Sequence, residues 1–145
     1  MQSLSLPKKL LVAVDGSEGS LAAGRYAIEL AIMVGAELFA LHVVQIPEYV
    51  SADVRSRLEK ELHSRGEAAL SKVREAAGAR NLTVHEKILT TTKSVVAAVC
   101  DAASKSSVEL VVLGNNGAGG MAQLMLGSVA AGVVREAACP VLVVR

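Results

Sequence analysis

The chain has 145 residues, of which 52% are apolar and 20% charged, and its formal net charge is +1. This length suits one folded domain with a substantial core, and the composition is typical of a compact globular protein rather than a disordered one. The near-neutral charge and the 2% of aromatic residues argue against a nucleic-acid partner, which needs a basic surface or a base-stacking platform.

The N-terminal part of the chain predicts a strand, a helix and a second strand. Residues 9–15 form a short apolar run that ends in the polar turn DGSEGS, which indicates a buried strand. Ser17 or Ser20 can cap the helix that follows, and Gly35 is placed to end it. Residues 37–46, which precede a proline, form the second expected strand.

The middle of the chain continues this alternation. Residues 53–77 predict a helix with an apolar stripe on one face and solvated charges on the other. The stripe consists of Val54, Leu58, Leu62, Ala69, Val73 and Ala76. Residues 82–88 alternate apolar and polar side chains, as an edge strand does. Thr92 or Ser94 can cap a third helix that runs to about Lys105.

The C-terminal part completes the series. Residues 109–113 form a continuous apolar strand, and residues 140–144 form a short apolar strand near the end of the chain. Between them, Gly127 and Ser128 open a last helix that we expect to end near Ala138. The element order is therefore βαβαβαβαβ, which is typical of a parallel sheet with helices on both faces.

These elements predict an α/β fold with one domain over residues 1–145 and an open parallel five-stranded sheet. The apolar strands 9–15 and 109–113 belong in the middle and the polar strand 82–88 at an edge, so the expected strand order is 3-2-1-4-5. Ligands of such sheets bind outside the carboxyl ends of the strands, at the point where the strand order reverses. Asp15 and Gly114 follow the two strands that meet there.

A spaced glycine pattern follows the fourth expected strand. Gly114 and Gly117 are followed, after nine further residues, by Gly127 and Ser128. A helix that begins at Gly127 directs unpaired N–H groups and a positive dipole end at the crevice, which favours an anion such as phosphate. The pattern is neither a Walker A loop nor the dinucleotide motif GxGxxG. The alternative is a purely structural loop in which the glycines serve turns and Ser128 is a helix cap.

Four segments together resemble the universal stress protein family, and specifically its ATP-binding branch. They are LLVAVDGSE, LHVV, GNNG-x9-GSV and ACPVLVVR, and the resemblance covers almost the whole chain. It implies a fold like that of the adenine nucleotide alpha hydrolases and a regulatory or signalling dimer in stress responses. It also implies ATP or another adenine nucleotide as the ligand.

The resemblance assigns roles to particular residues. Those lining the adenine and ribose side of the pocket would be Ala13, Val14 and Asp15. The residue that presents its backbone to the adenine would be Val43. Those at the end of the fourth strand and around the ribose and phosphates would be Leu113, Gly114, Asn115, Asn116 and Gly117. Those holding the outer phosphates through N–H groups and a hydroxyl would be Gly127, Ser128 and Val129.

The phosphate segment lacks a positive charge, because no Lys or Arg lies between Ser106 and Val134. Asn115, Asn116 and Ala118 stand where relatives often carry a hydroxyl residue and basic residues. We therefore expect Mg²⁺ to accompany the nucleotide. The sequence contains no convincing nucleophile–base pair, which favours a binding protein over an enzyme. The alternatives are a slow ATPase or adenylate-forming enzyme and an interaction module without nucleotide.

Remaining features concern assembly and location. The last strand is wholly apolar yet falls at a sheet edge, so we expect residues 140–145 to pair antiparallel with a second copy in a homodimer. The apolar runs are too short for a membrane span or a signal peptide, and Cys100 and Cys139 form no Cys-x-x-Cys pair. These features predict a cytoplasmic protein with no membrane partner. His42 is expected to be a hydrogen-bonded core residue.

Overall fold

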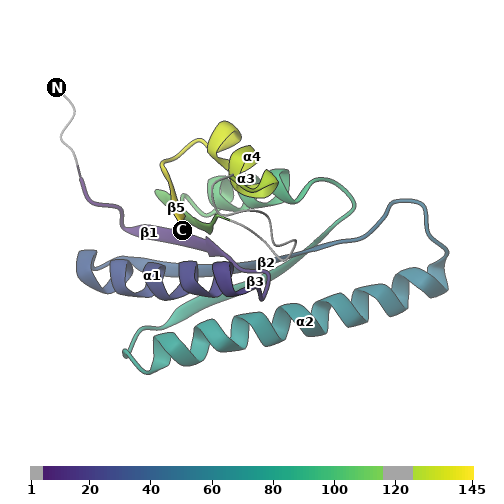
Figure 1. The fold of residues 1–145 in the computed structure, drawn as a ribbon, viewed down its shortest axis with the longest axis horizontal. Coiled ribbons are helices and arrows are strands. Elements are labelled where there is room, and N and C mark those ends of the chain that lie inside the picture. The colour runs from purple at the N-terminus through teal and green to yellow at the C-terminus, as the bar shows by residue number, and fades with distance from the viewer. Residues whose placement is uncertain (1–4, 116–125) are drawn as a thin grey trace.

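The computed structural model describes residues 5–115 and 126–145. Strands and helices alternate along the chain as the sequence predicts (Figure 1). The strands are β1 (Lys9–Ala13), β2 (Glu37–Gln45), β3 (Val84–Thr91), β4 (Leu110–Gly114) and β5 (Val141–Val144). The helices are α1 (Glu18–Val34), α2 (Ala52–Gly78), α3 (Val95–Lys105) and α4 (Ser128–Glu136).

The strands form one parallel sheet in the order β3-β2-β1-β4-β5, which confirms the expected topology. The central strand β1 is paired on both sides, with Leu11 opposite Phe39 of β2 and Val111 of β4. Its buried residues are apolar toward both faces, because each face is covered by helices. The more polar β3 lies at an edge, where one side of the strand meets solvent.

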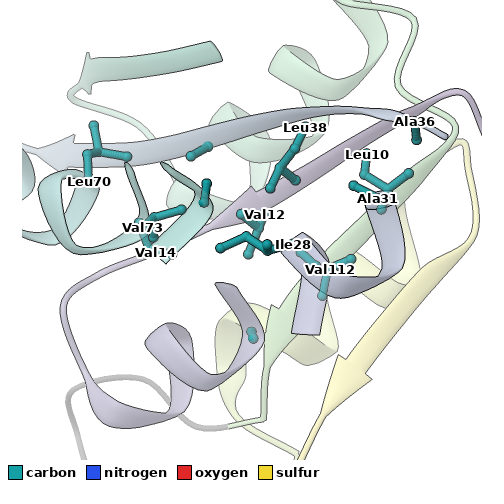
Figure 2. Packing of buried hydrophobic residues seen from close by; sticks show 14 of the residues in the cluster. Leu10, Val12, Val14, Ile28, Ala31, Ala36, Leu38, Leu70, Val73 and Val112 are labelled. Carbon is teal, nitrogen blue, oxygen red and sulfur yellow. The ribbon is translucent and has the colours of Figure 1, made fainter. Parts of the chain in front are cut away.

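Two hydrophobic clusters lie on opposite faces of the sheet. Leu10 and Val12 of β1 point to the face covered by α1 and α2, and Figure 2 shows Ile28 of α1 lying over Val12. Leu11 points to the opposite face, where residues of α3 and α4 such as Val99 complete the second cluster. The alternation of side chains along one strand thus supplies both cores.

Local capping interactions set most of the helix ends. Ser17, Ser51 and Ser94 each accept a hydrogen bond at Oγ from a backbone N–H in the first turn of the helix that follows, at 3.2, 3.4 and 3.0 Å. Ser94 rather than Thr92 therefore caps α3. Gly35 ends α1 in the left-handed conformation with φ of 70°, which glycine adopts at little cost. The capping alternatives left open by the sequence are decided by these contacts.

Several element boundaries differ from the sequence prediction, among them those of β3 and α4. The chain reaches β3 only at Val84, because the N–H of Leu82 still donates to the carbonyl of Ala77 and closes the end of α2. The strand then runs on to Thr91, whose carbonyl accepts from Ile46 at 2.9 Å. Similarly, α4 ends at Glu136, because Ala137 already has an extended backbone.

The expected apolar stripe of α2 is buried only in its second half, whereas Leu58 and Leu62 in the first half are partly buried. Val54 is 45% exposed, and the buried positions of the helix begin only at Gly66. The helix is longer than the strands that it covers, so its N-terminal turns project past the sheet (Figure 1). The C-terminal half carries the packing against the sheet, through residues such as Ala69 and Val73.

Close packing between α3 and α4 depends on Gly132. A Cβ at this position would lie 2.6 Å from Cγ2 of Val96 and 3.1 Å from its Cγ1. We expect Gly132→Ala to lower the free energy of unfolding by about 1 kcal/mol, because the overlap outweighs the higher helix propensity of alanine. In a Val96→Ala background the same change should be neutral or stabilising. Urea denaturation of the four proteins measures this coupling, and an equal effect in both backgrounds would contradict the contact.

Candidate functional site

The turn between β1 and α1 is built around Asp15. Its N–H donates to Oγ of Ser20 at 3.1 Å, and its carboxylate accepts from the N–H of Ser17 at 2.9 Å. Gly16, between them, has φ of +88°, which a residue with a Cβ rarely adopts. Asp15 is nevertheless exposed to solvent at the carboxyl end of the central strand. Asp15 therefore belongs to the polar turn DGSEGS expected from the sequence, and a ligand role at the same residue is compatible with this.

The end of β4 touches the start of α1 backbone to backbone. A Cβ on Gly114 would lie 2.7 Å from the carbonyl oxygen of Gly19 and 3.0 Å from the nitrogen of Ser20. Leu113, the preceding residue, is buried against the α3 and α4 face. Glycine is thus required at position 114 for the approach of two chain segments, whatever ligand binds nearby.

Asn115 joins three elements at this edge of the sheet. Its N–H donates to the carbonyl of Val144 at the end of β5, and its carbonyl accepts from the N–H of Gly127, both at 2.9 Å. The residue is 6% exposed. These bonds hold the end of β4 beside the start of α4, so that the two ends of the glycine pattern are adjacent. They also correct one expectation, because the Gly127 N–H is already bonded and is not available to a phosphate.

Helix α4 begins with its N-terminus at this same edge. Gly127 is the N-cap, with an extended backbone, and Ser128 is the first helical residue. Ser128 is therefore not the cap, which removes the structural alternative proposed for it, and its side chain is exposed. The N–H groups of Ser128 and Val129 belong to the first turn, which has no intrahelical acceptors for them. Together with the helix dipole they favour an anion here.

Val43 extends the site along β2. The N–H of Val14 donates to the carbonyl of Leu41 at 2.9 Å, so the peptide groups of Leu41 face β1. Those of Val43, two residues further on, face the same way, because peptide directions alternate along a strand. The pairing of β1 with β2 ends at Ala13 and Leu41, whereas β2 continues to Gln45. The backbone of Val43 therefore lies beyond the end of β1.

The structure thus gathers most of the predicted site residues at the carboxyl edge of the sheet. They are Ala13, Val14, Asp15, Val43, Leu113, Gly114, Asn115, Gly127, Ser128 and Val129. Asn116 and Gly117 lie outside the described residues. These residues offer backbone N–H and carbonyl groups, the exposed carboxylate of Asp15 and the exposed hydroxyl of Ser128, which suit a ligand with a polar ring and an anionic group.

Comparison with known proteins identifies the family. Residues 7–145 match the universal stress protein family. A universal stress protein of Methanocaldococcus jannaschii is 34% identical over 145 residues, which cover 97% of this chain and 84% of the relative. The chain belongs to the universal stress protein family.

Solved structures of universal stress proteins share the fold. UspA from Lactobacillus plantarum superposes with a TM-score of 0.82 at 26% identity, covering 95% of this chain and 97% of that one. A universal stress protein crystallised in complex with cAMP has a TM-score of 0.75 at 28% identity, covering 97% and 99% of the two chains. These matches confirm the single-domain architecture and its strand order.

The two cysteines of this universal stress protein pack on the α3 and α4 face of the sheet. Burial raises the pKa of the Cys100 and Cys139 thiols, and Glu136 and Asp101 add to the shift at Cys100. Little thiolate therefore forms near neutral pH, as expected of packing residues. Over residues 5–115 and 126–145, no three His, Cys, Asp or Glu side chains gather as a metal site. The described helices include none long and apolar enough to cross a bilayer.

His42 is the site neighbour whose role sequence reasoning missed. Its expected place as a hydrogen-bonded residue of the core is confirmed, since only 9% of it is exposed, but its partner was not predicted. Its Nδ1 lies 2.8 Å from the carbonyl oxygen of Val14, the residue before Asp15. Ser20, whose Oγ holds the N–H of Asp15, was likewise considered only as a cap. The His42 contact joins residues 28 apart and depends on which strands become neighbours, so no local signal reveals it, whereas the Ser20 contact lies within a single turn.

Proposed function

We propose that this universal stress protein binds an adenine nucleotide, ATP or a close relative, at the carboxyl edge of its sheet. The observation that carries the proposal is the hydrogen bond from Gly127 to the carbonyl of Asn115. It brings the N-terminus of α4 to the end of β4, beside the turn that holds Asp15. The structural neighbour in complex with cAMP supports an adenine nucleotide as the ligand class.

The base would meet the backbone of Val43. This residue has one N–H donor and one carbonyl acceptor directed past the end of β1. Adenine carries a complementary pair, with an acceptor at N1 and a donor at its 6-amino group. Guanine carries the opposite pair at these positions. The backbone of a single residue can therefore select the base without a dedicated side chain.

The phosphates would rest on the first turn of α4. The N–H groups of Ser128 and Val129 and the Ser128 hydroxyl are the donors, aided by the helix dipole. Asp15 supplies one carboxylate, and Mg²⁺ normally uses one or two carboxylates together with phosphate oxygens. The residues thus fit a Mg²⁺ ion that arrives with a triphosphate rather than a resident metal site. When bound, the ion would neutralise phosphate charge that no Lys or Arg of residues 107–133 can neutralise.

We propose a binding and signalling function in the cytoplasm rather than turnover. Asp15 already accepts a backbone hydrogen bond, and residues 107–133 offer no Lys or Arg to act beside the metal in phosphoryl transfer. A slow ATPase is the second candidate. Multiple-turnover assays with Mg²⁺ distinguish the two, because sustained hydrolysis abolished by Asp15→Asn would assign the protein to the enzymes.

The signalling unit would be a homodimer formed through β5. Strand β5 is an edge strand of four apolar residues, Val141–Val144, all only partly buried in the single chain. Antiparallel pairing with a second copy would satisfy its outer backbone groups and cover these side chains.

Two substitutions at Ser128 test the phosphate contact. Proline is well accepted at the first position of a helix, so Ser128→Pro should fold normally while losing both the N–H and the hydroxyl. Ser128→Ala loses the hydroxyl alone. We expect calorimetric titration with ATP and Mg²⁺ to show binding about tenfold or more weaker for the proline variant than for the alanine variant. Equal affinities, with thermal melts confirming the fold, would show that phosphate does not rest on this turn.

A further inference from the structure

We propose that His42 is a positioning residue that keeps the Val43 N–H available to the nucleotide base. The proposal rests on the proposed function, since it assigns a cause to the open backbone at Val43.

The β1–β2 ladder ends one hydrogen bond earlier than its geometry allows. Val14 donates its N–H to the carbonyl of Leu41 at 2.9 Å, as in a regular parallel ladder. The next bond of that ladder would run from the N–H of Val43 to the carbonyl of Val14. Instead, β1 ends at Ala13, and the Val14 carbonyl lies 2.8 Å from Nδ1 of His42. A carbonyl only accepts, so Nδ1 carries the proton and donates it.

The direction of this hydrogen bond explains why the ladder stops. His42 alternates along β2 with Leu41, whose side chain belongs to the α3 and α4 face, so the imidazole stands on the α1 and α2 face. The Val14 carbonyl accepts no bond from the Val43 N–H, and we infer that the bond to the imidazole draws this carbonyl out of the plane of the sheet. One side chain thus takes the acceptor that a backbone donor would otherwise use.

Helix α2 holds the imidazole in this position. A Cβ on Gly66 would lie 2.9 Å from Cγ and from Nε2 of His42, and closer still to Cδ2. The helix backbone therefore lies directly against one side of the ring. Gly78, on the same helix, would meet nothing within 4 Å if it carried a Cβ. Both Gly66→Ala and Gly78→Ala raise helix propensity, but only Gly66→Ala displaces the His42 ring. Comparing the two variants therefore isolates the effect of the displacement.

Amide hydrogen exchange at Val43 tests the inference without any ligand. In His42→Leu the Val14 carbonyl can accept from Val43, so this N–H should exchange about tenfold or more slowly than in the wild type. Asparagine can place its amide nitrogen where Nδ1 lies, so His42→Asn should exchange like the wild type. Gly66→Ala should resemble His42→Leu, and Gly78→Ala should resemble the wild type. If His42 served only the stability of the core, His42→Leu would be destabilised and its Val43 N–H would exchange faster than in the wild type, not more slowly.

Titration with AMP then connects the backbone to binding. His42→Leu should bind AMP about tenfold or more weakly, and His42→Asn should stay within about threefold of the wild type. Unchanged exchange at Val43 in both His42→Leu and Gly66→Ala would overturn the inference. If the wild type itself binds no adenine nucleotide, the proposed function fails, and the exchange measurement still decides whether His42 controls the Val43 N–H.

Discussion

Replacing Gly114 by valine is expected to lower the free energy of unfolding by about 3 kcal/mol, a large part of the roughly 5–15 kcal/mol typical of a domain. The reason is that the added side chain would meet backbone atoms of Gly19 and Ser20 in α1, at 2.7 and 3.0 Å from the Cβ. Backbone in the first turn of a helix cannot rotate aside as the side chain of Val96 can. Urea denaturation measures the loss.

Gly78→Ala is the matched control for this variant, because its Cβ would enter open space. It should be neutral or slightly stabilising, since alanine favours the helix. Gly114→Ala should fall between the two. If Gly114→Ala is as stable as Gly78→Ala, then β4 and α1 do not approach as closely as described. The presence of glycine at position 114 would then have to be explained by ligand binding alone.

Val143→Pro is expected to convert the proposed dimer into a folded monomer. The carbonyls of Pro140 and Val144 accept from Val111 and Asn115, so the peptide groups of alternate residues, including Leu142, face β4. Those of Val141 and Val143 face outward, where a second copy would pair. Proline at 143 removes an outward N–H and leaves the β4 ladder intact, a placement that edge strands tolerate. Sedimentation at micromolar concentration, beside a thermal melt, measures the change.

Leu142→Pro provides the opposite control, because it removes an N–H that faces β4. This variant should lose stability as well as assembly, whereas Val143→Ala, which keeps its N–H, should remain dimeric. A wild-type protein that sediments as a monomer would refute assembly through β5. A Val143→Pro variant that still dimerises would place the interface elsewhere on the molecule.

The sequence by itself determined the architecture, because the patterns that reveal strands and helices extend over only a few neighbouring residues. Alternating apolar runs and helical stripes are local, and the burial of an apolar strand on both faces dictates a central place in a parallel sheet. The order β3-β2-β1-β4-β5 follows from the contrast between the apolar β1 and the polar β3. Helix caps such as Ser17 and Gly35 were also predictable, because their hydrogen bonds span only a few residues.

The site was predictable in outline for the same reason. The carboxyl edge between β1 and β4 follows from topology, and the glycine spacing marks the start of α4. The extent of α2 beyond the sheet was not predictable, since an apolar stripe does not show where its partner surface ends.

Only the tertiary structure decided which atoms of the site remain available to a ligand. The bond of Gly127 to Asn115 removes one expected phosphate donor, and the bond of His42 to Val14 leaves the Val43 backbone open. The approach of Gly114 to α1 gives that glycine a packing role. Each contact joins residues far apart in the chain, and its geometry depends on strand register and on how closely a helix packs. Residue types and spacing do not encode those distances locally, because they arise when the sheet and its helices pack together.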